Sequence, residues 1–170
     1  MEEIMEYIKN HFYGKKDYFK VFIDNDSRVE GWFKGELIYI FTKLEKTNII
    51  DKFICEKKVE VSDQKKRKQI DFYIKKGNDK ILLEIKSLSI SERKTKRNLN
   101  FYFRNDNIGI LNDVNKLESI GQYKSKWILA FIYSLPNDDV LKNLLNDKKL
   151  KLYMDIKDNN GNYLIALIQV

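Results

Sequence analysis

Residues 69–86, QIDFYIKKGNDKILLEIK, constrain the fold of this chain more than any other stretch. Two runs of alternating apolar and polar residues flank Gly77 and Asn78, a pattern that predicts a β-hairpin with glycine at the first position of a type II′ turn. With Lys76 opposite Asp79, one face of this hairpin carries six apolar side chains: Ile70, Phe72, Ile74, Ile81, Leu83 and Ile85.

The polar face of the same hairpin brings two carboxylates together. The register predicts Asp71 directly opposite Glu84, at a Cβ separation of about 4.5–5.5 Å, and Gln69 opposite Lys86. Facing carboxylates repel each other, and a divalent cation between them removes that repulsion. Mg²⁺ is commonly held by one or two carboxylates together with waters and phosphate oxygens, so we expect Mg²⁺ or Mn²⁺ here.

Lys86 follows Glu84 by two residues and therefore shares its strand face. An ammonium at this place can orient or deprotonate a water, or stabilise the charge that develops on a phosphate under attack. Two carboxylates, a metal and a lysine together predict a site for phosphodiester hydrolysis.

The rest of the chain alternates between helical and strand patterns. Helices are predicted over 2–13, over about 27–44 with Ser27 as N-cap, near 109–120, and within 136–147. Strands are predicted over 53–61 and over the continuous apolar run 127–133, which is typical of a central strand. Residues 150–156 and 163–170 predict a second hairpin. This mixture indicates an α/β fold with helices on both faces of one mixed sheet.

The hairpin resembles the motif of the PD-(D/E)XK nuclease superfamily: it carries Asp71, twelve intervening residues and then Glu84-Ile85-Lys86. It also follows a predicted helix that carries Glu36. The resemblance covers residues 27–134 and implies a restriction-endonuclease-like fold, with a three-layer core and a mixed β-sheet flanked by helices. By this resemblance Asp71, Glu84 and Glu36 are the metal ligands and Lys86 is the catalytic lysine. Ile70 stands where the motif's name has proline, a position at which the family varies.

A helical wheel places Glu36 at the border of its helix's apolar stripe, about 70° from the centre, where its carboxylate is expected to reach over the sheet edge into the site. Glu60 is a reserve ligand and, in the alternative interpretation, an ordinary surface residue.

The net charge of +7 indicates a polyanionic partner. Basic residues cluster on both sides of the hairpin, and the second cluster also contains Phe101, Tyr102 and Phe103, a composition suited to phosphates and stacked bases. The predicted nucleic-acid-binding residues are Lys65, Lys66, Arg67, Lys68, Arg93, Lys94, Lys96, Arg97 and Arg104. A solvated loop with a hydrophobic anchor is the alternative interpretation.

Composition excludes several other classes of protein. The 170 residues suit one domain, residues 1–170, and no apolar run approaches the roughly 20 residues that cross a bilayer. The acidic N-terminus is unlike a signal peptide, and one cysteine and one histidine exclude an intramolecular disulfide and a His/Cys zinc site. We therefore expect a cytoplasmic protein without a membrane partner.

The function predicted from the sequence is a metal-dependent endonuclease, with DNA favoured over RNA. An RNA endonuclease and a non-catalytic nucleic-acid-binding protein on the same fold remain alternatives, and a homodimer remains open.

Overall fold

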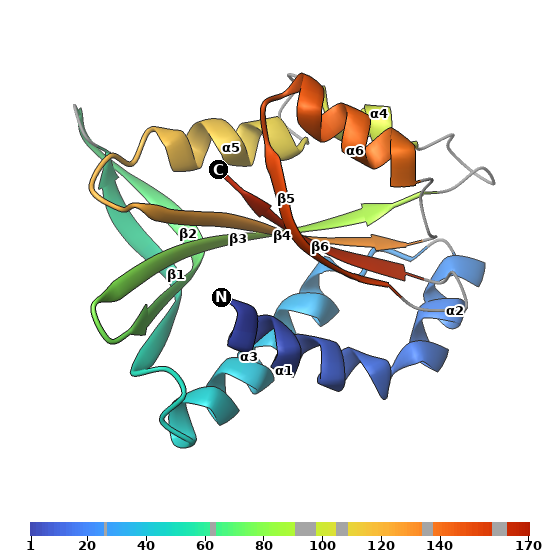
Figure 1. Ribbon diagram of the computed structural model, residues 1–170, viewed down its shortest axis with the longest axis horizontal. Coiled ribbons are helices and arrows are strands. Elements are labelled where there is room, and N and C mark those ends of the chain that lie inside the picture. Colours follow the sequence, from blue (N-terminus) through green and yellow to red (C-terminus); the bar gives the residue numbers. More distant parts are fainter. Residues whose placement is uncertain (26, 62–63, 91–97, 105–108, 134–137, 158–162) are drawn as a thin grey trace.

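A computed structural model describes residues 1–25, 27–61, 64–90, 98–104, 109–133, 138–157 and 163–170 (Figure 1). The helices are α1 (Glu2–Tyr13), α2 (Lys16–Asp24), α3 (Glu30–Lys46), α4 (Leu99–Tyr102), α5 (Ile110–Glu118) and α6 (Asp138–Asp147). The strands are β1 (Lys52–Val61), β2 (Gln64–Lys76), β3 (Asp79–Ser89), β4 (Ser125–Tyr133), β5 (Lys151–Lys157) and β6 (Tyr163–Gln169).

The described strands form one six-stranded sheet in the order β1-β2-β3-β4-β6-β5. Strands β3 and β4 run parallel, and the other neighbouring pairs run antiparallel. Helices α1 to α3 cover one face of the sheet and α4 to α6 cover the other (Figure 1). The predicted α/β class, with a mixed sheet flanked by helices, is therefore confirmed.

Two apolar clusters fill the spaces on either side of the sheet. Side chains of β4 alternate between them: Trp127, Leu129 and Phe131 pack toward α1 to α3, and Ile128, Ala130 and Ile132 pack toward the other helices. All six are buried, as the continuous apolar run of β4 predicts for a central strand. Between the apolar residues of β3, Glu84 and Lys86 contact charged residues of α5.

Two features at the N-terminal end of the chain differ from the sequence prediction. Residues of α2 were not predicted to be helical, and α3 begins at Glu30 instead of near Ser27. Ser27 has other partners: its N–H donates to the carbonyl of Phe22, and its carbonyl accepts from the Tyr133 hydroxyl at 2.5 Å. The cap position of α3 is occupied by Val29, two residues after Ser27, without a side-chain cap hydrogen bond, so the prediction of Ser27 as N-cap was wrong.

The register predicted for the β2–β3 hairpin is confirmed from Lys76–Asp79 to Phe72–Leu83. Gly77 has a φ of 59°, a conformation that glycine adopts without steric cost. The prediction that Ile70 shares the face of Phe72 was wrong, because Ile70 packs in the cluster on the side of α5 and Phe72 in the other. The strand therefore changes the face it presents at Asp71, which lies between these two residues.

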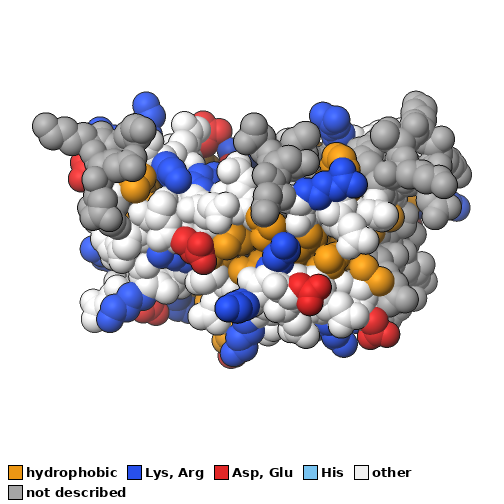
Figure 2. Space-filling model, turned by 90° about the horizontal axis from the view of Figure 1, so that it is seen from above, with side chains coloured by type: hydrophobic (Ala, Val, Ile, Leu, Met, Phe, Trp, Pro, Cys, Tyr) orange, Lys and Arg blue, Asp and Glu red, His pale blue; other side chains and the backbone are white. Residues whose placement is uncertain are grey.

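Figure 2 shows the face of the molecule above the sheet, where hydrophobic side chains gather in the middle and charged side chains surround them. Among the described residues, no helix has the length and apolar character that a membrane span requires.

Candidate active site

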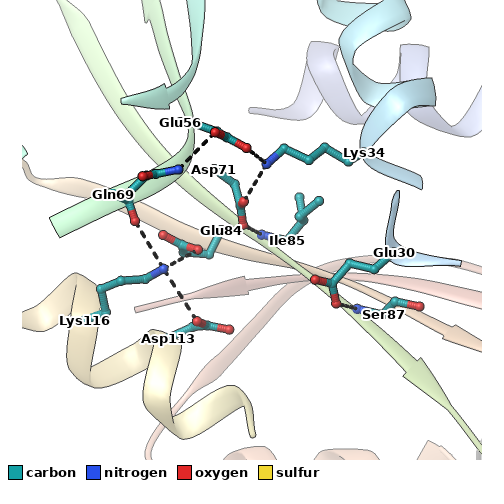
Figure 3. Close-up of polar contacts among 10 residues, drawn as sticks. All are labelled: Glu30, Lys34, Glu56, Gln69, Asp71, Glu84, Ile85, Ser87, Asp113 and Lys116. Atoms are coloured by element: carbon teal, nitrogen blue, oxygen red, sulfur yellow. Dashed lines mark hydrogen bonds and ion pairs between the residues drawn. The ribbon is translucent and has the colours of Figure 1, made fainter. Parts of the chain in front are cut away.

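Asp71 lies where β2 separates from β3. Phe72 and Leu83 are the last of the paired residues described for these strands, and beyond them the Ile85 N–H donates to Asp71 Oδ2 at 3.0 Å. The carboxylate thus takes the hydrogen bond that a strand partner's carbonyl would accept. This contact fixes Asp71 close to the plane of the sheet, beside the neighbouring residue Glu84 (Figure 3).

Glu84 is the most enclosed charged residue of the site, with 2% of its surface exposed. Its Oε2 lies 2.7 Å from the Nζ of Lys116 on α5, and its Oε1 has no hydrogen-bond partner among the described residues. Burial and the negative charge of Asp71 raise the pKa of Glu84 to about 8, and Lys116 offsets them only in part. At neutral pH, Glu84 therefore holds a proton beside an ionised Asp71.

Asp71 itself favours the ionised form. Burial would raise its pKa, but the Ile85 N–H, Glu84 and Lys34 together lower it. Lys34 reaches Asp71 Oδ1 from α3 at 3.1 Å and also contacts Glu56 at 2.9 Å (Figure 3).

Glu56 completes this side of the site from β1. Its backbone has a φ of 53°, in the left-handed region that residues other than glycine rarely adopt. Its carboxylate accepts from Lys34 and from the Gln69 amide at 3.0 Å. Such a conformation costs on the order of 1–3 kcal/mol.

Lys86 extends toward α5, where its Nζ lies 3.0 Å from Asp113 Oδ2. Burial would lower the pKa of Lys86, but the carboxylates of Asp113, Glu30 and Glu84 raise it. Lys86 is therefore an ammonium at neutral pH, and it is suited to donating hydrogen bonds and stabilising negative charge. The alternative role of a general base requires a neutral amine, which these carboxylates disfavour.

The raised pKa of Glu84 predicts how stability depends on pH in the metal-free protein. The unfolded chain releases the proton of Glu84 near pH 4.5 and the folded chain near pH 8, so stability falls as pH rises between these values. At about 1.4 kcal/mol per pH unit, the free energy of unfolding should decrease by about 2 kcal/mol from pH 6 to pH 8. Urea denaturation in a chelator measures this decrease.

Glu84→Gln is the matched variant for that measurement, because glutamine keeps the shape of the protonated acid and does not titrate. We expect the variant to lose most of the decrease between pH 6 and pH 8. Equal pH dependence in both proteins would contradict the assignment of this proton to Glu84.

The structure places Glu36 away from the predicted site. Its carboxylate contacts His11 Nε2 at 2.5 Å and Lys15 Nζ at 2.9 Å, in a pocket between α1 and α3. Burial would raise the pKa of Glu36, but Lys15 and His11 lower it. The expectation that Glu36 reaches over the sheet edge was wrong, because this flank of α3 faces α1.

The opposite flank of α3 faces the site instead. It carries Lys34 and also Glu30, whose carboxylate accepts from the Ser87 N–H at 3.4 Å (Figure 3). Glu30 also contributes to the raised pKa of Lys86. Glu30 is thus the carboxylate of α3 on the side of Lys86.

The donor set of Asp71 and Glu84 fits a divalent metal in one specific respect. Glu84 Oε1 is buried and no N–H or ammonium of the described residues contacts it, so a cation could bind there once Glu84 releases its proton. Among the described residues, no group of three or more His, Cys, Asp or Glu side chains is placed to hold a metal ion. A metal here would therefore depend on two carboxylates, with waters or phosphate oxygens as its other ligands.

The predicted basic surface is described only in part. Arg67 pairs with the reserve ligand Glu60 at 3.3 Å on the exposed end of the β1–β2 pair, and Arg104 lies 5.3 Å from the ring of Phe101. Lys68 is partly buried on β2. Six residues of the prediction have side chains that lie outside the described part of the chain: Lys65, Lys66, Arg93, Lys94, Lys96 and Arg97.

Sequence reasoning missed the two α5 residues of the site, Asp113 and Lys116. One signal could have found Asp113: it lies next to Ile110, Val114 and Leu117 on the helical wheel, so an acid occupies the apolar face of α5. Asp113 is 4% exposed in the structure, as that position implies. A charged residue on an apolar face is a candidate for a functional site because it needs a buried partner.

Comparison with protein-family models, with curated proteins and with solved structures finds no match for this chain.

Proposed function

We propose that this protein is a metal-dependent nuclease that hydrolyses phosphodiester bonds in DNA. The observation that carries the proposal is the pair Asp71 and Glu84 at the separation of β2 and β3, with a buried oxygen of Glu84 left without a hydrogen bond. Two adjacent carboxyl groups at this place do not stabilise the fold, because burying each of them costs free energy.

The residues of this site would have two different roles, metal binding and stabilisation of negative charge. Asp71 and Glu84 would hold Mg²⁺ or Mn²⁺, which supplies charge stabilisation at the phosphate and lowers the pKa of a bound water. The ammonium of Lys86 would stabilise the negative charge that develops on the phosphate oxygens, a role that its raised pKa supports.

The order of elements also supports the proposal. Helix α3, the antiparallel strands β1 to β3, the short helix α4, helix α5, and strand β4 parallel to β3 follow one another along the chain. This is the order that the resemblance to the PD-(D/E)XK superfamily implies, and in both cases the motif lies on the second and third strands.

The net charge of +7 supports nucleic acid as the substrate, because clustered lysine and arginine side chains attract phosphates. The preference for DNA over RNA is part of the proposal, and the cleavage assay compares the two substrates.

A cleavage assay tests the proposed function. The wild-type protein should cut plasmid DNA in the presence of Mg²⁺ or Mn²⁺ and should be inactive in EDTA, with single-stranded DNA and RNA as parallel substrates. Cleavage of RNA alone would replace the DNA nuclease with an RNA endonuclease. Absence of cleavage on all three substrates with either metal would contradict the proposal.

One observation favours a second candidate, a non-catalytic protein that binds nucleic acid. A lysine already contacts each of the two acids, Lys34 on Asp71 and Lys116 on Glu84, so each acid has a cationic partner without a metal. Metal-independent binding of DNA, together with the absence of cleavage, would favour this candidate over the nuclease.

A further inference from the structure

Lys116 lies among oxygen atoms from three different elements. Its Nζ is 2.7 Å from Glu84 Oε2 on β3, 3.4 Å from the Gln69 carbonyl on β2, and 3.7 Å from Asp113 Oδ1 on its own helix α5 (Figure 3). Carboxylate and carbonyl oxygens are also the ligands that hard divalent cations prefer. The ammonium therefore occupies surroundings of the kind that a metal ion would use.

Lys116 contacts only one of the two side-chain oxygens of Glu84. Oε2 is paired with Lys116, while Oε1 is buried without a hydrogen bond among the described residues. In this geometry the ammonium of Lys116 contacts one of the two oxygens of Glu84. Glu84 is thus held, but only partly satisfied, in the metal-free protein.

Lys116 also has a second acceptor when it leaves Glu84. Asp113 precedes it by three residues, so the two side chains are neighbours on the surface of α5. The side chain of lysine is a flexible four-carbon chain, and a small rotation can transfer its ammonium from one carboxylate to the other. Leaving Glu84 would not strand the charge of Lys116 in the interior.

Lys34 has a different position from Lys116. It is shared between Asp71 and Glu56, and the other oxygen of Asp71 accepts from the Ile85 N–H. Both oxygens of Asp71 therefore have partners. Of the two proposed metal ligands, Glu84 has the oxygen without a partner, and Glu84 is the residue that Lys116 contacts.

We infer that Lys116 is the resident cation of the metal-free site: its ammonium stays beside Glu84 until a divalent ion binds, and then moves to Asp113. This inference rests on the proposed function, because it takes Asp71 and Glu84 as metal ligands. Lys116 is a positioning residue and a competitor of the metal, and it contributes no bond to the reaction. Because the metal must displace the ammonium of Lys116 from Glu84, an exchange of one cation for another, the apparent metal affinity of the wild-type protein is weakened.

Calorimetric titration with Mn²⁺ in the absence of nucleic acid tests the inference. Lys116→Met removes the competing ammonium and keeps much of the side chain's volume, so it should bind Mn²⁺ about tenfold more tightly or better, the scale of one charge-assisted contact. Lys116→Arg keeps the charge and should remain within a few fold of the wild-type affinity. Lys75→Met is the matched control, because Lys75 pairs with Asp51 at 3.3 Å and removing it changes the net charge equally.

A second measurement needs no variant. Acetylation of Lys116 by an amine-reactive reagent, followed by mass spectrometry, should change in rate by several fold when Mn²⁺ is added to the wild-type protein. The rate at Lys75 should stay constant. An unchanged rate at Lys116 in Mn²⁺-bound protein would overturn the inference even if Lys116→Met failed to fold.

The outcomes separate the inference from the proposed function. Wild-type protein that binds Mn²⁺ while Lys116→Met binds no more tightly than Lys75→Met overturns the inference alone. If neither the wild type nor any Lys116 variant binds Mn²⁺, the metal site fails and the inference fails with it. Tighter binding by Lys116→Met, together with a changed acetylation rate at Lys116, establishes the exchange.

Discussion

Saturating Mn²⁺ is expected to raise the melting temperature of the wild-type protein by about 5–10 °C, and Asp71→Asn or Glu84→Gln should abolish the rise. A ligand at a hundredfold excess over its dissociation constant stabilises the folded state by about 2.7 kcal/mol. In a chain of this size, 1 kcal/mol corresponds to about 2–4 °C. Both substitutions replace a carboxyl group by an amide of the same shape, so they should also abolish metal-dependent cleavage. Thermal melts with and without Mn²⁺ measure the response.

Glu36→Gln is the matched control for this experiment. It makes the same chemical change on α3, at a carboxylate that contacts His11 and Lys15 instead of Asp71 or Glu84. The Mn²⁺ response of this variant should equal that of the wild type. A wild-type response in both Asp71→Asn and Glu84→Gln would remove these residues from the metal site.

Lys86→Ala should lower the rate of DNA cleavage by roughly 10²-fold or more and leave the Mn²⁺ response intact. This is the scale of losing one group that stabilises charge in the transition state. The substitution does not strand Asp113 without a cation, because Lys116 lies 3.7 Å from its other oxygen. Cleavage rates under single-turnover conditions, beside thermal melts in Mn²⁺, separate the loss of chemistry from a loss of metal.

Lys75→Ala provides the comparison for Lys86→Ala, since both variants lose one lysine from the β2–β3 hairpin. Lys75 is paired with Asp51 at the other end of the hairpin, and its loss should change the cleavage rate little. Equal rates in Lys86→Ala and Lys75→Ala would show that Lys86 has no part in the reaction.

The hairpin was predictable because its information is local. Alternation fixes which residues share a face, and a short turn fixes the register, so Phe72 opposite Leu83 follows from the sequence alone. The change of face at Asp71 was not predictable in this way. It depends on how β1 and β3 hold the strand, including the left-handed backbone of Glu56 and the hydrogen bond from the Ile85 N–H.

The position of Glu36 shows the limit of a helical wheel. Glu36 and Lys34 lie on opposite flanks of the apolar stripe of α3, at comparable angles from its centre. The wheel does not say which flank faces the sheet edge and which faces another helix. That choice depends on α1, whose His11 contacts Glu36 across 25 residues of sequence.

The partners supplied by α5 were harder to predict, because they depend on packing between elements far apart in the chain. Lys86 meets Asp113 only when α5 lies over β3, and the segment between these elements includes residues outside the described part. Periodicity placed the helix near 109–120 but did not identify which of its charged residues face the sheet.

The position of Asp71 in the plane of the sheet links two layers that are otherwise separate. The sheet divides the apolar core into two clusters, and substitutions in one cluster would ordinarily have little effect on the other. Lys34 acts on Asp71 from the α3 layer, while Lys116 acts on the adjacent Glu84 from the α5 layer. The effects of changing these two lysines should therefore not add, so we expect this pair of acids to couple the two layers thermodynamically.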